Sequence, residues 1–406
     1  MLAFFFMPTK NPKLNSHNKT SLFKYYAGFS MDFVENAIHK ILNENNSSEN
    51  LLVLDPWNGS GTTTNICGRL GIASIGIDRN PAMAIISKAR EASEYDFSSL
   101  STGLDEDKIR PSKKDPLLSW ITPSGVGILR KVEQNILALT SNEAKSLGYV
   151  ILFNTTKNLL KKYISSNPTW IKKPDPKSRI RLTLSSAKAE LDICINLIKN
   201  QKHHDNRTHK IPSIIVADSR AIPIRNQIVD LVITSPPYCT RIDYAVATSI
   251  ELAVLAHDQE KFRLLRNELI GSTLIENGIS VNCAWGKLCC ETLERIRSHP
   301  SKASNGYYIK NFLRYFDSLY ESIIEISRVT KLGGICYIVI QDSYYKEIFI
   351  DLASITCDMF KVNGWSLKEK TDFVSKRNKA HINTKSTKYQ KNKIATESVL
   401  ILRREK

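Results

Sequence analysis

The sequence lacks the features that mark a membrane protein or a metal site. It has no apolar run of about 18 residues, so no transmembrane helix is predicted. Its eight cysteines include no Cys-x-x-Cys, and with His203 and His204 they give no metal-ligand spacing, so we predict no metal site. The apolar start, Met1 to Met7, has no basic lead-in and is a poor signal peptide. We therefore expect reduced thiols in a cytoplasmic protein.

Acidic residues are scarce in two stretches, which carry almost all of the net charge of +17. Residues 155–210 hold 13 Lys or Arg against 4 Asp or Glu, and residues 368–393 hold 9 against 2. The rest of the 406-residue chain is nearly neutral. Such segments are typical of a protein that contacts a polyanion, although a solvated lysine-rich face is the alternative for each segment alone.

A glycine turn near the N-terminus lacks the residues of two common phosphate-binding motifs. Residues 51–63 read Leu-Leu-Val-Leu-Asp-Pro-Trp-Asn-Gly-Ser-Gly-Thr-Thr, which predicts a strand, a turn and a helix that Thr62 or Thr63 caps. The turn has neither the lysine of a P-loop nor the third glycine of the dinucleotide fingerprint. Asp55 closes the strand, and a carboxylate beside a small glycine turn fits an ammonium group better than a pyrophosphate.

Two further predicted strands also end in aspartate. Asp78 follows the strand Ala73–Ile77, and Asp218 follows Ser213–Ala217. Asp78 lies 23 positions beyond Asp55, about the spacing at which an acidic residue reaches ribose hydroxyls in a βαβ unit. The carboxyl ends of parallel strands meet at one edge of a sheet, so the three residues predict a shared ligand site. A helix cap is the alternative for any one of them.

A rigid polar turn follows another predicted strand, Ile228 to Ile233. Residues 234–238 read Thr-Ser-Pro-Pro-Tyr. Two prolines fix φ and remove two backbone donors, so Ser235 and the nearby carbonyls are presented as acceptors. Tyr238 offers a flat face beside them. The combination suits a planar ring that carries an exocyclic amino group, and a plain proline-rich turn is the alternative for this motif alone.

Together these motifs resemble those of the amino-methylating DNA methyltransferases, which use S-adenosylmethionine to methylate N4 of cytosine or N6 of adenine. Residues 55–63 are similar to the family's cofactor motif, with Trp57 in place of Phe, and residues 234–238 to its catalytic motif. Further similarities are Ala27–Val34, Leu332–Gly334 before a strand running to Ile340, and a closing strand Glu397–Leu402. The resemblance implies an α/β fold with a doubly wound, mostly parallel sheet of the methyltransferase type and a mainly helical insertion.

The resemblance also implies a role for each matched residue. The cofactor-binding residues would be Phe29, Asp55, Trp57, Gly59, Ser60, Gly61, Asp78 and Asp218. Asp55 and the glycine turn would hold the methionine part of the cofactor, Asp78 the ribose and Asp218 the adenine, with Phe29 and Trp57 packed against it. The catalytic residues, which would hold a flipped base, would be Ser235, Pro236, Pro237 and Tyr238. Double-stranded DNA is the implied substrate, and a cognate restriction endonuclease or another defence protein the implied partner.

The spacing of the motifs divides the chain. About 135 residues separate Asp78 from the strand that begins at Ser213, far more than a simple crossover needs. Apolar residues at three- and four-residue spacing predict helices over 126–139, 142–160 and 180–199. We predict an N-terminal segment and cofactor-binding half (1–96), a mainly helical basic insertion that contacts DNA (97–211) and a catalytic half (212–406). The last contains a second insertion at about 240–310, in which Arg241 and Tyr244 would lie near the flipped nucleotide.

Several alternatives stay open. Serine rather than aspartate at position 235 favours cytosine N4 within this family, and adenine N6 is the nearest alternative. Methylation at carbon 5 of cytosine needs a cysteine after proline, and no Pro-Cys dipeptide occurs. An RNA base methyltransferase and an inactive DNA-binding module are further alternatives, the second disfavoured by the three aspartates. The cofactor motif precedes the catalytic motif, unlike the order in many Ser-Pro-Pro-Tyr enzymes, so the segment that reads the DNA sequence is not identified.

Overall fold

The structure is a computed structural model that describes residue 23 and residues 30–45, 51–92, 97–104, 109–165, 170–202, 210–239, 242–272, 278–375 and 395–406. The strands are β1 (Leu52–Asp55), β2 (Ala73–Asp78), β3 (Ser213–Val216), β4 (Val229–Thr234), β5 (Thr330–Gln341), β6 (Ser343–Tyr345), β7 (Ile348–Ile350), β8 (Trp365–Ser375) and β9 (Ala395–Arg404). Within these ranges, seven strands form one sheet in the order β3-β2-β1-β4-β5-β9-β8, and β6 pairs with β7. The strands β1 to β5 are parallel, and β9 is antiparallel to β5 and β8. The predicted doubly wound, mostly parallel α/β sheet is therefore confirmed.

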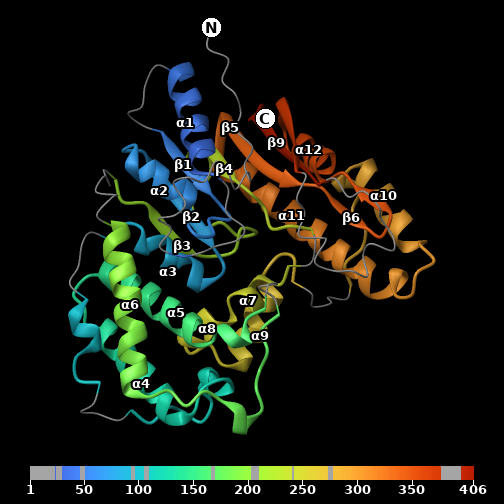
Figure 1. Cartoon of the computed structure of the whole chain (residues 1–406). Helices are drawn as coiled ribbons and strands as arrows, with labels where there is room; N and C mark the ends of the chain where they lie inside the picture. The colour runs from blue at the N-terminus through green and yellow to red at the C-terminus, as the bar shows by residue number, and fades with distance from the viewer. Residues whose placement is uncertain are drawn as a thin grey trace.

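Helices cover both faces of this sheet (Figure 1). They are α1 (Met31–Asn45), α2 (Thr62–Arg69), α3 (Pro81–Ala89), α4 (Pro123–Leu137), α5 (Asn142–Leu159), α6 (Leu184–Lys202), α7 (Tyr244–Ala247), α8 (Ser249–Val254), α9 (Gln259–Glu268), α10 (Lys287–Arg297), α11 (Ile309–Val329) and α12 (Leu352–Val362). Successive strand residues point to opposite faces, as the two-residue period of a strand requires. Val53 and Leu231 pack with α1 and α2, whereas Leu54 and Val232 pack with α11 and α12.

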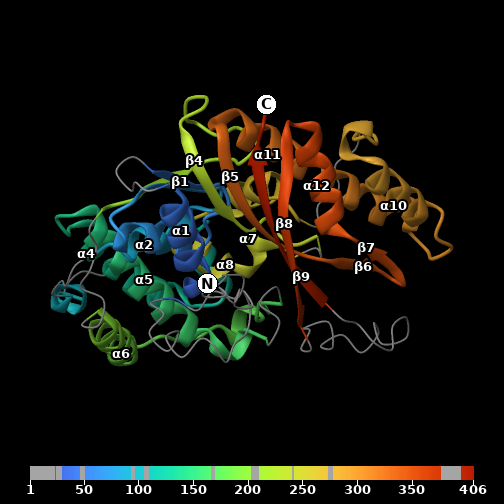
Figure 2. The same cartoon turned by 90° about the horizontal axis from the view of Figure 1, so that it is seen from above.

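Helices α4, α5 and α6 form a helical region whose core also includes residues of α3 and α8. Val132, Phe153 and Leu191 of these helices share that core with Met83 of α3 and Leu252 of α8. Figures 1 and 2 both place this region on one side of the sheet, with α10 and β6 on the other. The region is thus packed against the sheet layer through α3 and α8.

The three helices predicted between 126 and 199 are present, but two of them begin elsewhere. Helix α4 starts earlier, at Pro123, because proline at the first helical position has the φ that a helix needs. Helix α6 starts later than residue 180, because the Ile180 amide donates to the Trp120 carbonyl at 2.8 Å and holds that residue in an extended bridge to Ile121. A tertiary contact therefore delays the start of α6 to Leu184, although the apolar spacing begins at residue 180.

None of the helices in the described ranges is long and apolar enough to cross a membrane. Across the same ranges, His, Cys, Asp and Glu side chains form no group of three that could hold a metal ion. All eight cysteines are free thiols.

Candidate active site

A cleft opens where the strand order reverses, between β1 and β4. In doubly wound sheets ligands bind beyond the carboxyl ends of the strands at such a point. The cleft encloses about 990 Å³ of empty space, part of it open to solvent, which is enough for a nucleoside-sized ligand. Its lining comes from three separate parts of the chain, which lie within residues 55–83, 218–248 and 268–270. Only the folded sheet brings them together.

Asp55 lines this cleft and is only 2% exposed. Its Oδ1 accepts hydrogen bonds from the Thr234 hydroxyl at 2.6 Å and from the Trp57 amide at 3.1 Å. No cationic side chain among the described residues pairs with it. Burial raises the pKa of Asp55 to about 6, against the lowering effect of the Thr234 hydrogen bond. A buried carboxylate without a counter-ion is costly, so this end of the cleft favours a cationic ligand.

Asp78 holds the glycine turn against the end of β2. Its Oδ2 accepts the Gly59 amide at 2.9 Å, and its Oδ1 accepts the Asn80 amide at 2.8 Å. Burial raises the pKa of Asp78 to about 6, although the two backbone donors lower it. Asp55 and Asp78 therefore each have a pKa of about 6.

Gly61 makes the turn between β1 and α2 sterically feasible. Its φ is +81°, and a Cβ placed on it would lie 2.2 Å from the Ser87 Oγ. Ser87 in turn accepts a hydrogen bond from the Asn58 side chain at 2.9 Å. The expectation that Thr62 or Thr63 caps α2 is wrong: both lie inside the helix, and its N-cap residue is Gly61. The left-handed glycine turns the chain one residue earlier than a threonine cap would.

Ion pairs close the rim of the cleft near Asp218. The Arg220 guanidinium donates to both Asp218 oxygens, with Nη2 2.7 Å from Oδ2. Burial raises the pKa of Asp218, but the Arg220 contacts outweigh it and hold the pKa below its ordinary value. Arg220 also donates to the Glu268 carbonyl, and Arg79 pairs with the Glu268 carboxylate at 2.5 Å. The loops after β2 and β3 are thereby tied to the end of α9.

The Thr-Ser-Pro-Pro-Tyr turn follows β4 and is held from behind by two tyrosines. The Tyr238 amide donates to the Tyr244 hydroxyl at 3.1 Å, and the Tyr315 hydroxyl donates to the Pro237 carbonyl at 2.9 Å. Burial raises the pKa of both hydroxyls, so they remain protonated. No hydrogen bond joins the Ser235 hydroxyl or the Pro236 carbonyl to another described residue, and both residues line the cleft. The turn therefore presents these two acceptors to a ligand.

The structure gathers ten of the twelve predicted site residues around this cleft. They are Asp55, Trp57, Gly59, Ser60, Asp78, Asp218, Ser235, Pro236, Pro237 and Tyr238. Gly61 shapes the turn without lining the cleft, and Phe29 lies outside the described residues, as does Arg241.

The sequence interpretation missed other lining residues, among them Asn80, Thr248 and Glu268. Asn80 caps α3, because its Oδ1 accepts the Ala82 amide at 3.1 Å. Its position directly before Pro81 is a recognisable helix start and would have identified it. Thr248 and Glu268 carry no local signal, because they reach the cleft only through the packing of α7, α8 and α9.

Comparison with known proteins identifies relatives of this chain. The DNA methylase family of N6 and N4 methyltransferases matches residues 7–89 and 229–406, more than half of the chain. The type II methyltransferase M.BsoBI of Geobacillus stearothermophilus is 27% identical over 297 residues, which cover 63% of this chain and 56% of that protein. M.AvaI of Nostoc sp. is 28% identical over 151 residues, covering 34% and 31%. The chain thus spans little more than half of the length of M.BsoBI and about a third of that of M.AvaI.

A solved S-adenosylmethionine-dependent methyltransferase from Methanosarcina mazei aligns with 90% of this chain and 97% of its own, at 8% identity and a TM-score of 0.31. That likeness is too distant to bear on the site. The family match leaves out residues 90–228, the stretch that contains α4, α5, α6 and β3.

Proposed function

The chain belongs to the DNA methylase family, whose cofactor is S-adenosylmethionine, and from this premise we propose that it is a type II DNA methyltransferase acting on the exocyclic N4 of a cytosine flipped out of double-stranded DNA. The observation that carries the proposal is the juxtaposition in one cleft of Asp55, a buried carboxylate without a cationic partner among the described residues, and the Ser235–Tyr238 turn. The names of the relatives M.BsoBI and M.AvaI support the type II assignment.

The cleft fits S-adenosylmethionine in the chemistry of its donors and acceptors. The bound cofactor supplies a methyl group on a positively charged sulfur, next to an ammonium group. Asp55 would hold the ammonium group, because its buried charge needs a cation. Asp78 would accept the ribose hydroxyls through lone pairs left over by its two backbone donors. Asp218 lies at the rim where the adenine would be held, and Trp57 and Ser60 line the wall between.

The catalytic turn would act by positioning the base. The lone pair of a cytosine amino group is delocalised into the ring, which makes it a weak nucleophile. The Ser235 hydroxyl and the Pro236 carbonyl can accept its two N–H groups and draw the nitrogen toward tetrahedral geometry. Tyr238 would stack on the ring. Methyl transfer breaks the sulfur–methyl bond and moves the positive charge to the amino nitrogen, which then loses a proton to water, so alignment and desolvation of the reacting groups matter more than a strong base.

Identification of the methylated base tests the proposal directly. DNA incubated with the protein and cofactor is digested to nucleosides, and the products are separated by mass. N4-methylcytosine is the expected product, because the resemblance to the family favours cytosine where serine, and not aspartate, occupies position 235. N6-methyladenine would contradict the cytosine assignment and favour the adenine alternative. Methylation of RNA alone, or no product despite cofactor binding, would favour the remaining two alternatives.

Variants of the catalytic turn should separate chemistry from cofactor binding. Replacement of Tyr238 by alanine should cost stacking of about 1–3 kcal/mol and weaken binding of the flipped base accordingly. Ser235→Ala should lower turnover and leave cofactor affinity nearly unchanged, because Ser235 would face the base. Single-turnover rates and calorimetry with S-adenosylmethionine measure the two effects. Normal turnover in Ser235→Ala would remove the serine hydroxyl from the mechanism and leave only the Pro236 carbonyl.

The basic helical region is the proposed contact for the DNA backbone. Between α5 and α6 the chain carries Lys172, Lys173, Lys177, Arg179 and Arg181, and all but the half-buried Arg179 are exposed. Trp170, at 60% exposure, stands among them. Lysines interleaved with an exposed aromatic side chain suit contact with phosphates and bases. In the second basic stretch, residues 376–393, which include Lys385, Lys388, Lys391 and Lys393, lie outside the described residues.

Neutralising these five basic residues of the helical region should flatten the salt dependence of DNA binding. Each phosphate contact that is lost should remove about 0.9 log units of affinity per decade of salt from the slope. Glutamine at Lys331 and Lys361 is the control and should leave the slope unchanged. Lys331 lies at the amino end of β5 and Lys361 in the last turn of α12, just before β8, whereas the cleft lies beyond the carboxyl ends of the strands. Fluorescence anisotropy at several salt concentrations gives the slopes. An unchanged slope in the five-residue variant would mean that DNA lies elsewhere.

A further inference from the structure

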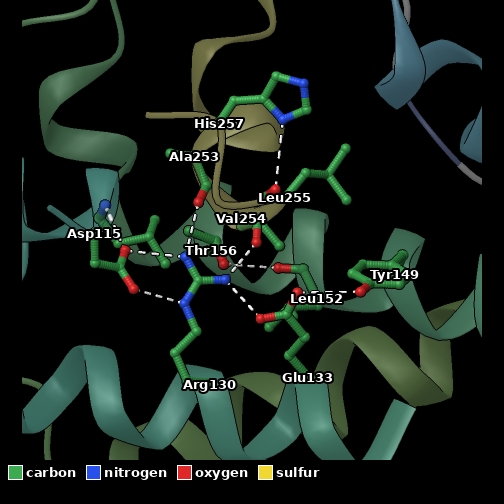
Figure 3. Close-up of polar contacts among 11 residues, drawn as sticks. Asp115, Arg130, Glu133, Tyr149, Leu152, Thr156, Ala253, Val254, Leu255 and His257 are labelled. Carbon is green, nitrogen blue, oxygen red and sulfur yellow. Dashed lines mark hydrogen bonds and ion pairs between the residues drawn. The ribbon is translucent and has the colours of Figure 1, made fainter. Parts of the chain in front are cut away.

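Arg130 of α4 ties the helical region to the short helix α8 (Figure 3). Its guanidinium donates to the carbonyls of Val254 at 2.5 Å and Ala253 at 3.0 Å, the last two residues of α8. The Ala253 carbonyl also accepts the Ala256 amide at 3.1 Å, and a cation at this position meets the negative end of the helix dipole. Arg130 therefore caps the carboxyl end of α8 from another helix.

Two acidic side chains fix the Arg130 guanidinium in this orientation. Asp115 accepts from Nε at 2.7 Å and from Nη2 at 2.9 Å, and Glu133 accepts from Nη1 at 2.6 Å. Tyr149 donates to the other Glu133 oxygen at 3.1 Å (Figure 3). The side chains of Arg130, Asp115 and Glu133 are 11%, 5% and 17% exposed. A guanidinium held on both sides at this depth has little freedom to move.

The helical region holds α8 at a second point. Lys157 of α5 pairs with Glu251 of α8 at 2.5 Å, and the Glu251 side chain is completely buried. Leu252 of α8 lies in the core that the helices of this region share. Helix α8 is thus held by the helical region through this ion pair and through shared core packing, in addition to the Arg130 contacts.

The other end of α8 forms part of the cofactor cleft. Thr248, the residue before α8, lines the cleft and accepts the Asn80 side-chain amide at 2.8 Å. Asn80 in turn donates its backbone amide to Asp78, which holds Gly59 of the glycine turn. Thr248 and Asn80 are buried, at 4% and 2% exposure. A continuous set of short contacts therefore runs from Arg130 through α8 to Asp78.

We propose that Arg130 is a positioning residue for the cofactor cleft: by holding the carboxyl end of α8, it keeps Thr248, and with it the Asn80–Asp78 edge, in the geometry that binds the cofactor. The inference rests on the proposed function and deepens it. Arg130 connects the region that would contact DNA to the site that would hold S-adenosylmethionine. A displacement of α4 on DNA would therefore shift Asp78.

Cofactor affinity without DNA, measured by calorimetry on the full chain, tests the role of Arg130. Arg130→Gln should weaken S-adenosylmethionine binding about tenfold, the effect of one or two lost hydrogen bonds. Turnover at saturating cofactor should fall less than cofactor affinity, because the Tyr315 hydroxyl of α11 holds the catalytic turn at Pro237 from outside α8. Arg130→Lys keeps the charge but cannot span both carbonyls, so it should recover only part of the affinity.

Two further variants separate positioning from stability. The triple variant Arg130→Met, Asp115→Asn, Glu133→Gln removes the hold on α8 and leaves no unpaired charge, so it should fold and still bind the cofactor weakly. Met359→Ala, at a buried residue of α12, should lower the melting temperature without changing cofactor affinity.

The outcomes distinguish this inference from the proposed function. Wild-type affinity in the folded Arg130→Lys and triple variants would overturn the role of Arg130. Equal weakening in Met359→Ala would also overturn it, because the effect would then be general destabilisation. A wild-type protein that binds no S-adenosylmethionine would instead contradict the proposed function. In a Thr248→Val background, Arg130→Lys should cost little further affinity if the contact runs through Thr248, and a fully additive loss would contradict that route.

Discussion

The substitution Asp55→Asn should abolish useful cofactor binding and at the same time stabilise the empty protein. The amide oxygen of the new side chain could still accept from the Thr234 hydroxyl and the Trp57 amide, so the turn should keep its shape. The charge that would pair with the ammonium group is gone, and loss of one partner from a buried ion pair should weaken binding about 100-fold or more. Calorimetry and thermal unfolding of the variant measure both effects.

The gain in stability follows from the raised pKa of Asp55. Its pKa is about 6 in the folded protein and 3.8 when unfolded, so between these values the folded state binds the extra proton. Stability therefore falls as the pH rises from about 4 to about 6, and ionised Asp55 costs on the order of 2–3 kcal/mol at pH 7. Asp55→Asn should be more stable than the wild type at pH 7 and nearly equal to it at pH 4.

The same titration should appear in cofactor binding. Wild-type affinity should rise as the pH passes through about 6 and Asp55 and Asp78 ionise, whereas the Asp55 variant should lose much of this dependence. Asp230→Asn is the matched control and should leave cofactor affinity unchanged. Asp230 pairs with Lys331 at the amino ends of β4 and β5, whereas the cleft lies beyond the carboxyl ends of the strands. Unaltered affinity in Asp55→Asn would mean that the ammonium group binds elsewhere.

The substitution Gly61→Ala should disrupt both the fold and the cleft. The left-handed φ of +81° costs a residue with a side chain about 1–2 kcal/mol, and overlap of the new Cβ with Ser87 should cost about 1–3 kcal/mol more. The turn through Gly59 and Ser60 would have to move, so cofactor binding should be lost as well. Chemical denaturation and calorimetry give the two quantities.

Gly333→Ala separates the two causes. Gly333 has a φ of +78°, but a Cβ there would meet its nearest atom, Arg403 Nη2, only at 3.8 Å. This control should show the conformational cost alone and bind the cofactor normally. Equal losses of stability in the two variants would mean that Ser87 gives way without cost and that the turn is less constrained than the contact distances indicate.

The sequence predicted those parts of the site whose chemistry is local. Asp55 and Asp78 end predicted strands, and the turns that follow contain glycine or proline with few conformations open to them. The same residues both terminate the strand and would bind the ligand, so a short stretch of sequence contains the whole signal. Membership of the DNA methylase family and the doubly wound sheet both followed from such windows.

Contacts between distant segments could not be predicted in this way. Arg130 reaches Val254 across 124 positions, and nothing in the sequence around either residue specifies the other. The late start of α6 has the same origin, because Ile180 pairs with Trp120 although its apolar spacing continues the helical pattern. Glu268 joins the lining only because Arg79 and Arg220 bind it from the loops after β2 and β3. In each case tertiary packing selected among conformations that the local sequence allows equally.

The adjacency of β1 and β4 constrains how a newly made chain can fold. Synthesis runs at about 5–20 residues per second, so β1 leaves the ribosome on the order of ten seconds before β4, whose first residue is Val229. During that interval one edge of β1 has no strand to pair with and is open to association with other chains. The glycine turn is already made, but the Thr234 side chain that contacts Asp55 is not. The cofactor therefore cannot stabilise the nascent chain until β4 has joined the sheet, and fragments that end before Val229 should aggregate rather than bind it.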